Sequence, residues 1–256
     1  MNIASALHDT RLLYMHHLRA SLRTKVAVVF GMLQPLLYLL LFGPLLTRLN
    51  GVRGFGDHDP WQVFVPGILV QLVLFRSGFV GFALIADLRA GVVDRLRVTP
   101  VSRAAMLLGM VLRDTTVLVV QAILLLAAGL ALGLRAPLPG LLIGLALAVL
   151  LATGIASLSY VLAMVTRRED AFASLLSSVT LPLMLLSGML LPMSMAPGWL
   201  DAVSRCTPLR YVVDAVRAAF LGDYAASPVV VGTAVTVVLV AASVWWGARR
   251  FVRETA

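Results

Sequence analysis

Residues able to do chemistry are few in this chain of 256 residues, and their types exclude several classes of protein. A zinc site needs three or four His, Cys or carboxylate ligands at close spacing. The chain has one cysteine, and its four histidines stand outside every long apolar segment, at positions 8, 16, 17 and 58. The phosphate-binding loop of ATPases is a glycine-rich turn that ends in lysine, but the only lysine, Lys25, follows "LRT". We therefore expect this chain itself to bind no metal or cofactor and to hydrolyse no ATP.

A short basic stretch, DRLRVTPVSR at residues 94–103, separates two long apolar segments. Five of its residues could contact a partner: Asp94, Arg95, Arg97, Pro100 and Arg103. The proline disfavours helical backbone at the residue before it, so we predict a short helix over residues 87–98 followed by a turn. The stretch is either a helix that offers its charges to another protein or a solvated loop whose positive charge only fixes the topology.

Two ionisable residues inside apolar segments are candidates for a polar site in the membrane, Arg76 and Asp114. An unpaired guanidinium in hydrocarbon costs a few kcal/mol on insertion scales, so such residues face a bundle interior, a cavity or a subunit interface. Arg76 is expected either to form a structural pair with Asp114 or a backbone carbonyl, or to contact a substrate or lipid headgroup.

These residues must be positioned by long apolar helices. The chain is 60% hydrophobic and only 13% charged, with a mean hydropathy of +0.96. A transmembrane helix needs about 20 mainly apolar residues, and six windows qualify: 26–46, 61–86, 104–132, 138–165, 171–191 and 228–248. Because the windows are continuously apolar rather than alternating with period two, a helical bundle is favoured over a β-barrel. We predict an all-α integral membrane protein with six transmembrane helices in a single domain over residues 1–256.

Basic residues indicate how the bundle is oriented, because Lys and Arg concentrate on the cytoplasmic side. With a cytoplasmic amino terminus, thirteen of the 21 Lys and Arg lie inside and six outside, with Arg76 and Arg113 in apolar windows. Both termini are therefore expected to be cytoplasmic. This asymmetry also accounts for the net charge of +9, so we expect no nucleic-acid partner.

The first 25 residues and residues 192–227 complete the predicted plan. Residues 1–25 place Ile3, Leu7 and Leu18 on one helical face, which favours an amphipathic helix in the membrane interface over a frayed basic tail. Pro192 and Pro208 interrupt the chain after the fifth window, so residues 192–227 are expected to form an extracellular re-entrant helical hairpin or a folded loop. Its candidate residues are Pro192, Pro208, Tyr211, Asp214 and Arg217. Asp214 and Arg217, three residues apart, are expected to form a local pair.

Two passages resemble a known family. DLRAGVVDRLRVTPVSRAAMLLGMVLRD (87–114) and LLSGMLLPMSMAPGWLDAVSRCTPLRYVVDAVRAAFLGD (185–223) are similar to parts of the membrane subunits of type-2 ATP-binding-cassette (ABC) transporters, most closely the daunorubicin-resistance-like exporters. The chain departs from the family pattern at Arg89, where an acid is common, and at Met110, where a basic residue is usual.

The resemblance implies an exporter subunit in the bacterial plasma (inner) membrane. The segments would then be an interfacial helix (1–25), spans 1–2 (26–86), a cytoplasmic coupling segment (87–103), spans 3–5 (104–191), the hairpin (192–227), and span 6 with its tail (228–256). Asp94, Arg95, Arg97, Pro100 and Arg103 would dock on a separate ATPase subunit. Two ATPase copies, which hold ATP and Mg²⁺, and a second permease half, identical or related, would complete the transporter.

The resemblance implies a hydrophobic or amphipathic substrate, either a drug-like natural product or a lipid. Two alternatives stay open: export of a polysaccharide or lipid-linked glycan, and a stand-alone carrier driven by an ion gradient.

The charge asymmetry predicts a topology that cysteine labelling can test. In a Cys206→Ala background, a cysteine at position 58 should react with a membrane-impermeant thiol reagent in intact cells. A cysteine at position 95 should react only after permeabilisation. Labelling of position 95 in intact cells would reverse the topology.

Overall fold

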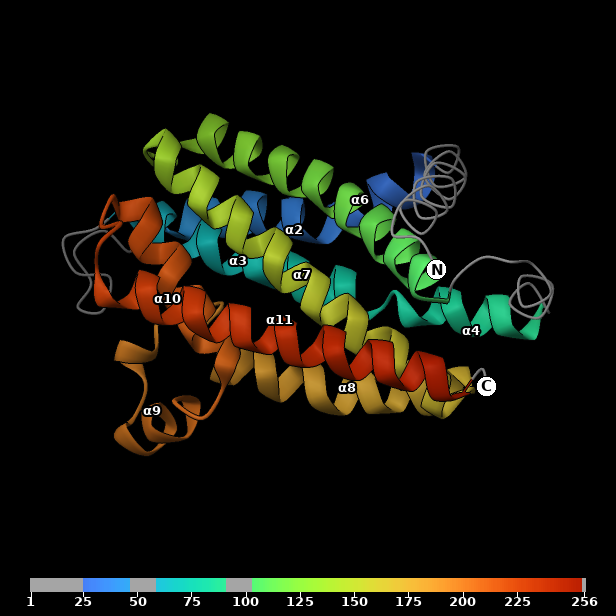
Figure 1. The fold of residues 1–256 in the computed structure, drawn as a ribbon. Helices are drawn as coiled ribbons and strands as arrows, with labels where there is room; N and C mark the ends of the chain where they lie inside the picture. Colours follow the sequence, from blue (N-terminus) through green and yellow to red (C-terminus); the bar gives the residue numbers. More distant parts are fainter. Residues whose placement is uncertain (1–24, 47–58, 91–102, 255–256) are drawn as a thin grey trace.

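A computed structural model describes residues 25–46, 59–90 and 103–254 of the chain, and all the regular elements in these ranges are helices (Figure 1). They are α2 (Lys25–Leu46), α3 (Pro60–Gly78), α4 (Gly81–Arg89), α6 (Arg103–Leu132), α7 (Leu138–Thr166), α8 (Glu169–Leu186), the 3₁₀ turn η1 (Met193–Met195), α9 (Gly198–Ser204), α10 (Pro208–Leu221) and α11 (Ser227–Glu254). The predicted interfacial helix at residues 1–25 and most of the coupling segment lie outside the described residues.

The helices have the length and composition of a membrane bundle. Five stretches of the described chain are long and apolar enough to cross a bilayer: Pro60–Arg89, Gly109–Leu132, Leu138–Thr166, Glu169–Leu186 and Ser227–Gly247. Helix α2 is apolar over most of its 22 residues but is not among these five. The prediction of an all-α integral membrane fold is confirmed, and the sixth span, which would be α2, stays a prediction.

The second predicted span, 61–86, is divided rather than continuous. Helix α3 ends at Gly78 and α4 begins at Gly81. The hydroxyl of Ser159, on α7, donates to the carbonyl of Gly78 and accepts from the N–H of Gly81 at 3.0 Å. A side chain from another helix has thus entered the backbone ladder, which is one of the known causes of a helix break.

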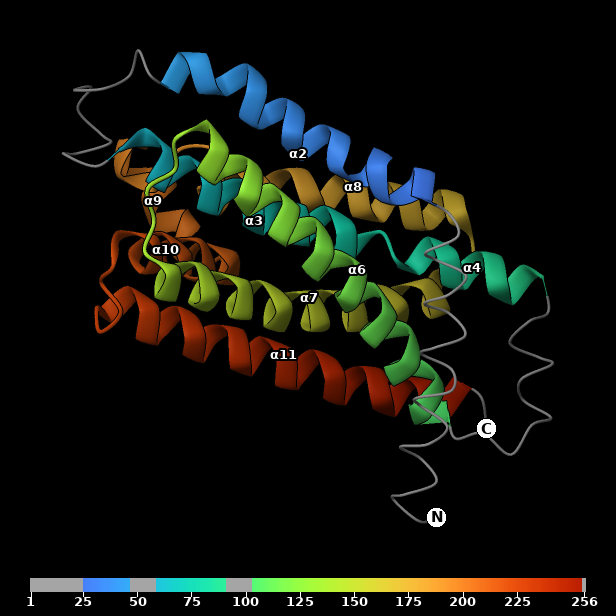
Figure 2. The same ribbon diagram turned by 90° about the horizontal axis from the view of Figure 1, so that it is seen from above.

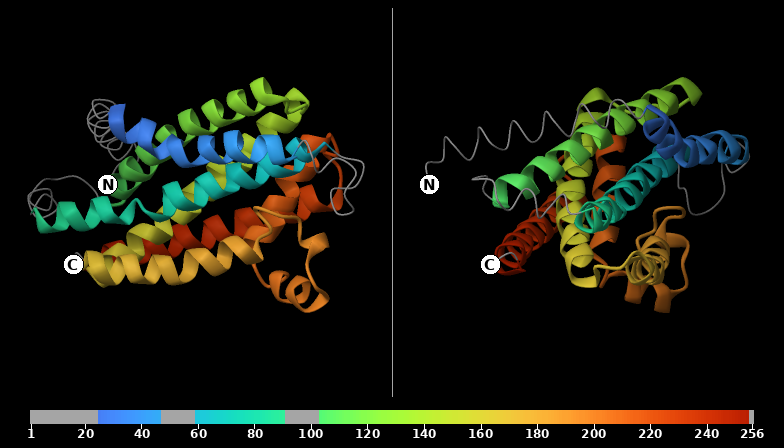
Figure 3. Two further views of the ribbon diagram at one scale, coloured as in Figure 1. Left: turned by 180° about the vertical axis from the view of Figure 1, so that it is seen from behind. Right: turned by 90° about the vertical axis from the view of Figure 1, so that its right-hand side faces the viewer.

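The fifth predicted span, 171–191, ends five residues early. Helix α8 stops at Leu186, and Gly188 then adopts a left-handed backbone with φ of +72°. Glycine populates this region without the steric penalty that a Cβ carries, so the chain turns here and leaves the bundle towards η1 and α9. Figure 3 shows α9 lying outside the main bundle, beside the end of α8.

Helix α7 is the centre of the bundle and packs against α3, α4, α6, α10 and α11. In Figure 2, α2 lies at one edge of the molecule and α11 at the other, with α3, α6 and α7 between them. Glycines allow the closest approaches: a Cβ on Gly140 would lie 2.1 Å from the carbonyl oxygen of Ala219, and one on Gly232 would lie 2.3 Å from that of Tyr211. Small residues at helix crossings are typical of membrane bundles, where packing replaces the hydrophobic driving force.

Helix α8 is loosely covered by the rest of the described chain. Only Phe172 and Leu176 are buried along it, while Leu175, Leu181 and Leu185 are exposed. An apolar helix with this much free surface must face lipid or another protein chain.

Helix α3 packs so closely on the turn after α8 that adding one methyl group at this contact should lower the stability of the protein. A Cβ at Gly67 would lie 1.7 Å from the carbonyl oxygen of Met189, whereas a Cβ at Gly78, on the same helix, meets nothing within 4 Å. We expect Gly67→Ala to lower the free energy of unfolding by about 1–3 kcal/mol, the usual range for overpacking. Gly78→Ala serves as the matched control and should change it little. Thermal unfolding of both purified variants in detergent measures the difference, and equal melting temperatures would contradict the described contact.

Candidate functional site

The predicted hairpin region contains two helices, α9 and α10, at one end of the bundle. Pro208 stands in the first turn of α10, where its missing N–H needs no partner. Gly222 ends the helix in a left-handed conformation, and its N–H donates to the carbonyls of Ala218 and Ala219. One face of α10 is fully buried and includes Val212, Val216, Ala219 and Phe220.

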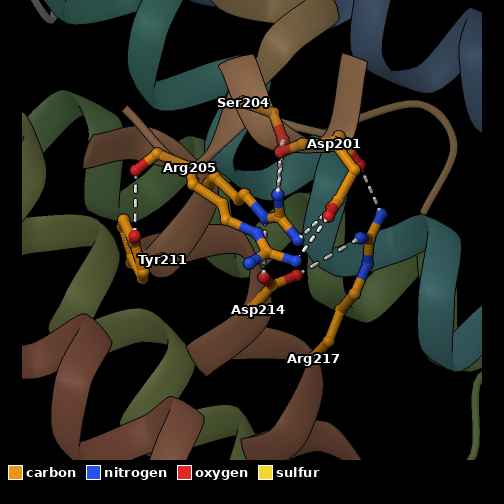
Figure 4. A network of polar contacts seen from close by, with 8 residues as sticks. Asp201, Ser204, Arg205, Tyr211, Asp214 and Arg217 are labelled. Carbon is orange, nitrogen blue, oxygen red and sulfur yellow. Dashed lines mark hydrogen bonds and ion pairs between the residues drawn. The ribbon is translucent and has the colours of Figure 1, made fainter. Parts of the chain in front are cut away.

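A polar network centred on Asp201 joins α9 to α10 (Figure 4). The Asp201 carboxylate accepts from Arg205 at 2.7 Å and forms an ion pair with Arg210 at 2.6 Å. Arg210 also donates to the backbone carbonyl of Asp201 at 2.9 Å and to the Ser204 hydroxyl. The hydrogen bonds from Arg205 and Arg210 lower the pKa of Asp201. The predicted site residue Tyr211 donates to the carbonyl of Arg205 at 2.9 Å. Together these contacts fix the angle between the two helices.

Arg217 extends this network into the bundle. Its side chain is buried, with 8% of the residue exposed, and Figure 4 shows it pointing away from Arg205 and Tyr211. Its Nε donates to the carbonyl of Val63 on α3 at 3.0 Å, and its Nη2 donates to the carbonyl of Gly188 at 2.7 Å. One guanidinium therefore joins α10, α3 and the turn that follows α8.

Burial and charge oppose each other in the pair Asp214 and Arg217. The expected local pair is present, with 3.9 Å between Nη1 of Arg217 and the Asp214 carboxylate. Burial lowers the pKa of Arg217 to about 10, so the guanidinium stays charged at neutral pH. Burial also raises the pKa of Asp214, against the opposing effect of Arg217 and Arg210. The pair carries no net charge when both are ionised, so its two partners need not be separately solvated.

These residues line a cleft of about 510 Å³ at this end of the bundle. Its walls come from α3, η1, α9 and α10 and include Val63, Pro192, Asp201, Arg210, Asp214 and Arg217. All five predicted hairpin residues thus lie in one region, although Pro208 and Tyr211 do not reach the cleft. Asp201 and Arg210 are central to the cleft, although the sequence analysis did not single them out. Each has an oppositely charged residue four positions later, Arg205 for Asp201 and Asp214 for Arg210, and this helical spacing could have indicated them.

The intramembrane residues are arranged differently from the predicted pair. Asp114 on α6 is buried and binds its neighbour Arg113 at 2.7 Å and the hydroxyl of Tyr160 on α7. Arg76 forms no ion pair with Asp114 among the described residues. It lines a separate cavity of about 270 Å³ between α2 and α3 with Gln34, Tyr38 and Gln71. The sequence analysis did not single out Gln34 and Gln71; their signal was an amide in the middle of a long apolar window, 26–46 for Gln34 and 61–86 for Gln71.

The comparisons with known proteins agree with this architecture. Residues 8–221 match the family model described as ABC-2 type transporter. The chain belongs to the ABC-2 type transporter family. It is therefore a permease, the membrane subunit of an ABC transporter and not its ATPase.

Similar proteins include permeases named for drug resistance. The daunorubicin resistance ABC transporter permease protein DrrB1 of Streptomyces coeruleorubidus is 29% identical over 197 residues, which cover 75% of this chain and 68% of the relative. A protein of Mycobacterium tuberculosis described as doxorubicin resistance ABC transporter permease protein DrrC is 26% identical over 212 residues, 81% of this chain and 75% of the relative. A protein of Cyanophora paradoxa described as transport permease ycf38 is 29% identical over 197 residues, 76% of this chain and 68% of the relative. The assignment to the daunorubicin-resistance branch of type-2 ABC permeases is confirmed.

In the permease, the predicted ATPase-docking residues Asp94, Arg95, Arg97 and Pro100 lie outside the described residues. Arg103 is the first residue of α6. The neighbouring end of α4 is tied to the start of α8 by an ion pair of 2.9 Å between Arg89 and Glu169. Figure 1 places the end of α4 and the start of α6 at the end of the bundle opposite α9 and α10.

The position of Arg217 predicts a stability difference between two arginines of the permease. Arg217→Met leaves the carbonyls of Val63 and Gly188 without this donor inside the protein, and an unsatisfied buried group costs about 1–3 kcal/mol. Arg205→Met removes an ion pair whose arginine is 68% exposed, so we expect a loss of at most about 1 kcal/mol. Thermal unfolding in detergent compares the two identical substitutions. If Arg205→Met lowered the melting temperature more than Arg217→Met, the contacts of Arg217 would not be what holds the hairpin region in place.

Proposed function

We propose that this permease forms the membrane path of an ATP-driven exporter of amphipathic or hydrophobic compounds, with two ATPase subunits and a second permease half. The observation that carries the proposal is the family match over residues 8–221, in a chain without a phosphate-binding loop. The ATPase subunits hold ATP and Mg²⁺. The complex sits in the bacterial inner membrane with both termini of the permease in the cytoplasm, as its basic residues favour.

Coupling to the ATPase is assigned to residues 87–103, between α4 and α6. Asp94 and Arg97 are three residues apart and share a face if this segment is helical, where they can meet complementary charges on an ATPase surface. Helix α4, which leads into this segment, supports a role in passing movement from the ATPase to the bundle. It packs on α7 and α8 and is joined to α8 by the Arg89–Glu169 ion pair. A displacement of the docked segment would therefore reach α8.

The substrate class is supported by an apolar cavity of about 230 Å³ beside α8. Its walls come mainly from α3, α7 and α8 and include Leu74, Ile155, Leu162, Leu176, Val179 and Leu239. The volume is below the roughly 300–1,000 Å³ of ordinary small-molecule sites. A second permease half against the exposed face of α8 would enlarge it, and the apolar walls suit the drug-like or lipid substrates that the relatives' names suggest.

Glycan export and ion-driven transport are the competing functions. A glycan path is expected to carry aromatic side chains, whereas aromatics make up 7% of the chain and line none of this cavity. An ion-driven carrier should transport as a purified single chain under a pH gradient without nucleotide, which distinguishes it from the proposed function.

The proposal predicts that Asp94→Arg separates membrane assembly from ATPase coupling. Losing one partner of a docked, buried charge pair costs about 2–5 kcal/mol, so the variant should insert normally but copurify poorly with the ATPase or lose substrate-stimulated hydrolysis. Pro100→Ala, which lets the preceding helix continue, should reduce coupling less. The measurement is copurification and ATPase activity in nanodiscs.

Arg253→Glu, a charge reversal in the carboxyl-terminal tail, is the control and should behave as wild type. Full association, hydrolysis and export in Asp94→Arg would leave residues 94–103 as a loop that only fixes topology.

A further inference from the structure

The cavity between α2 and α3 differs from the rest of the apolar bundle in its polar lining. It has a volume of about 270 Å³ and is lined by Gln34 and Tyr38 from α2 and by Gln71 and Arg76 from α3. Ile68, Leu72 and Phe75 supply an apolar wall along the same groove. It is separate from the apolar cavity beside α8, with which it shares no lining residue.

Two polar atoms of this cavity lack a hydrogen-bond partner within the described part of the protein. The Oε1 atom of Gln71 is buried and unpaired, and the residue is only 3% exposed. The Nε–H of Arg76 is also buried and unpaired. Buried polar groups are normally satisfied, and leaving an acceptor and a charged donor open at one place is costly. A ligand that accepts from the arginine and donates to the amide would satisfy both groups at once.

Arg113, the other arginine inside an apolar window, has an ion-pair partner, which sets Arg76 apart. Arg113 is paired with Asp114 at 2.7 Å. The Asp114 carboxylate is already occupied by Arg113 and Tyr160, and no described carboxylate forms an ion pair with Arg76. The guanidinium therefore presents its positive charge to the cavity.

The apolar wall beside Arg76 points to a lipid-like ligand. Arg76 lies within Pro60–Arg89, a stretch long and apolar enough to cross a bilayer, where an unpaired charge is costly. Ile68, Leu72 and Phe75 line the same groove as the guanidinium. A charged headgroup at Arg76 would thus have its tail along apolar side chains.

We propose that this groove binds the anionic headgroup of an amphiphile, either a membrane phospholipid or an exported substrate of the same charge. Arg76 pairs with the phosphate or carboxylate, as guanidinium groups do with planar or multidentate oxyanions. Gln71 Oε1 accepts from a hydroxyl or ammonium group beside that anion. The amide of Gln34 and the hydroxyl of Tyr38, 3.5 Å apart, form the opposite wall. The site selects against cationic amphiphiles, which Arg76 repels.

Binding can be measured on the purified full-length permease without its ATPase. The probes are phosphatidylglycerol, which has a phosphate and free hydroxyls, and phosphatidylcholine, which lacks a hydrogen-bond donor in its headgroup. A ligand that binds only the folded state raises the melting temperature, so phosphatidylglycerol should stabilise the wild type more than phosphatidylcholine at equal mole fraction in detergent micelles. Arg76→Met should remove this difference. Arg135→Met, the same change at an exposed arginine, should keep it.

Gln71→Leu provides a second variant that keeps the charge. It removes the unpaired amide, so it should raise the melting temperature of the lipid-free permease and weaken phosphatidylglycerol binding by about tenfold, the usual effect of losing one hydrogen bond. If Arg76→Met does not fold, Gln71→Leu decides the question. A phosphatidylglycerol effect that survives Arg76→Met, or that is unchanged in Gln71→Leu, would overturn the proposal.

Reconstitution with the ATPase distinguishes whether the headgroup belongs to a resident membrane phospholipid or to an exported substrate. Only this experiment rests on the proposed function. ATP-dependent movement of fluorescent phosphatidylglycerol between leaflets that is lost in Arg76→Met would identify the headgroup as that of a transported substrate. Arg76-dependent binding without movement would identify a resident phospholipid. If hydrophobic compounds are not exported at all while binding persists, the proposed function fails and the headgroup site stands.

Discussion

Backbone hydrogen bonding in a medium without water is the constraint on which this structure depends. A helix that stops inside an apolar bundle leaves N–H and C=O groups that no solvent can satisfy. The permease has two such interruptions in its described part, one between α3 and α4 and one after α8. Each is satisfied by a side chain from a different helix: Ser159 bridges Gly78 and Gly81, and Arg217 binds the carbonyls of Gly188 and Val63. The irregular backbone is tolerated because α7 and α10 bring these donors to it.

Three arginines show three ways in which a cation is accommodated at depth. Arg113 is neutralised by the adjacent Asp114, and Arg217 is solvated mainly by peptide carbonyls, with Asp214 further away. Arg76 has neither arrangement, and its cavity also contains the unpaired amide oxygen of Gln71. The first two arrangements explain structure, and the third is the basis of the proposed headgroup site, because no described residue supplies the missing partner.

The sequence predicted those features that depend on local composition. Residues 138–165 were expected to span the membrane, and α7 covers Leu138–Thr166, because nearly every residue in the window is apolar or small. The break at residues 79–80 could not be predicted, since Gly78 and Gly81 resemble ordinary glycines of a membrane helix until Ser159, about 80 positions later, is placed beside them. Arg217 was expected to pair with Asp214, but its best hydrogen bonds reach residues 154 and 29 positions away. Asp114, one of the alternatives offered as a partner for Arg76, is bound instead by its neighbour Arg113 and by Tyr160, which lies on another helix.

The interruption between α3 and α4 also has a mechanical meaning. A continuous helix is stiff along its axis, so a push at one end is felt at the other. At residues 79–80 the backbone ladder is interrupted, while α4 packs on α7 and is also joined at its far end to α8 through Arg89 and Glu169. A force applied to α4 therefore reaches α7 and α8 as well as α3. The α3 segment is anchored at its other end by Arg217, which binds the carbonyl of Val63, so a displacement of α4 need not be carried along α3 as it would be in one continuous helix.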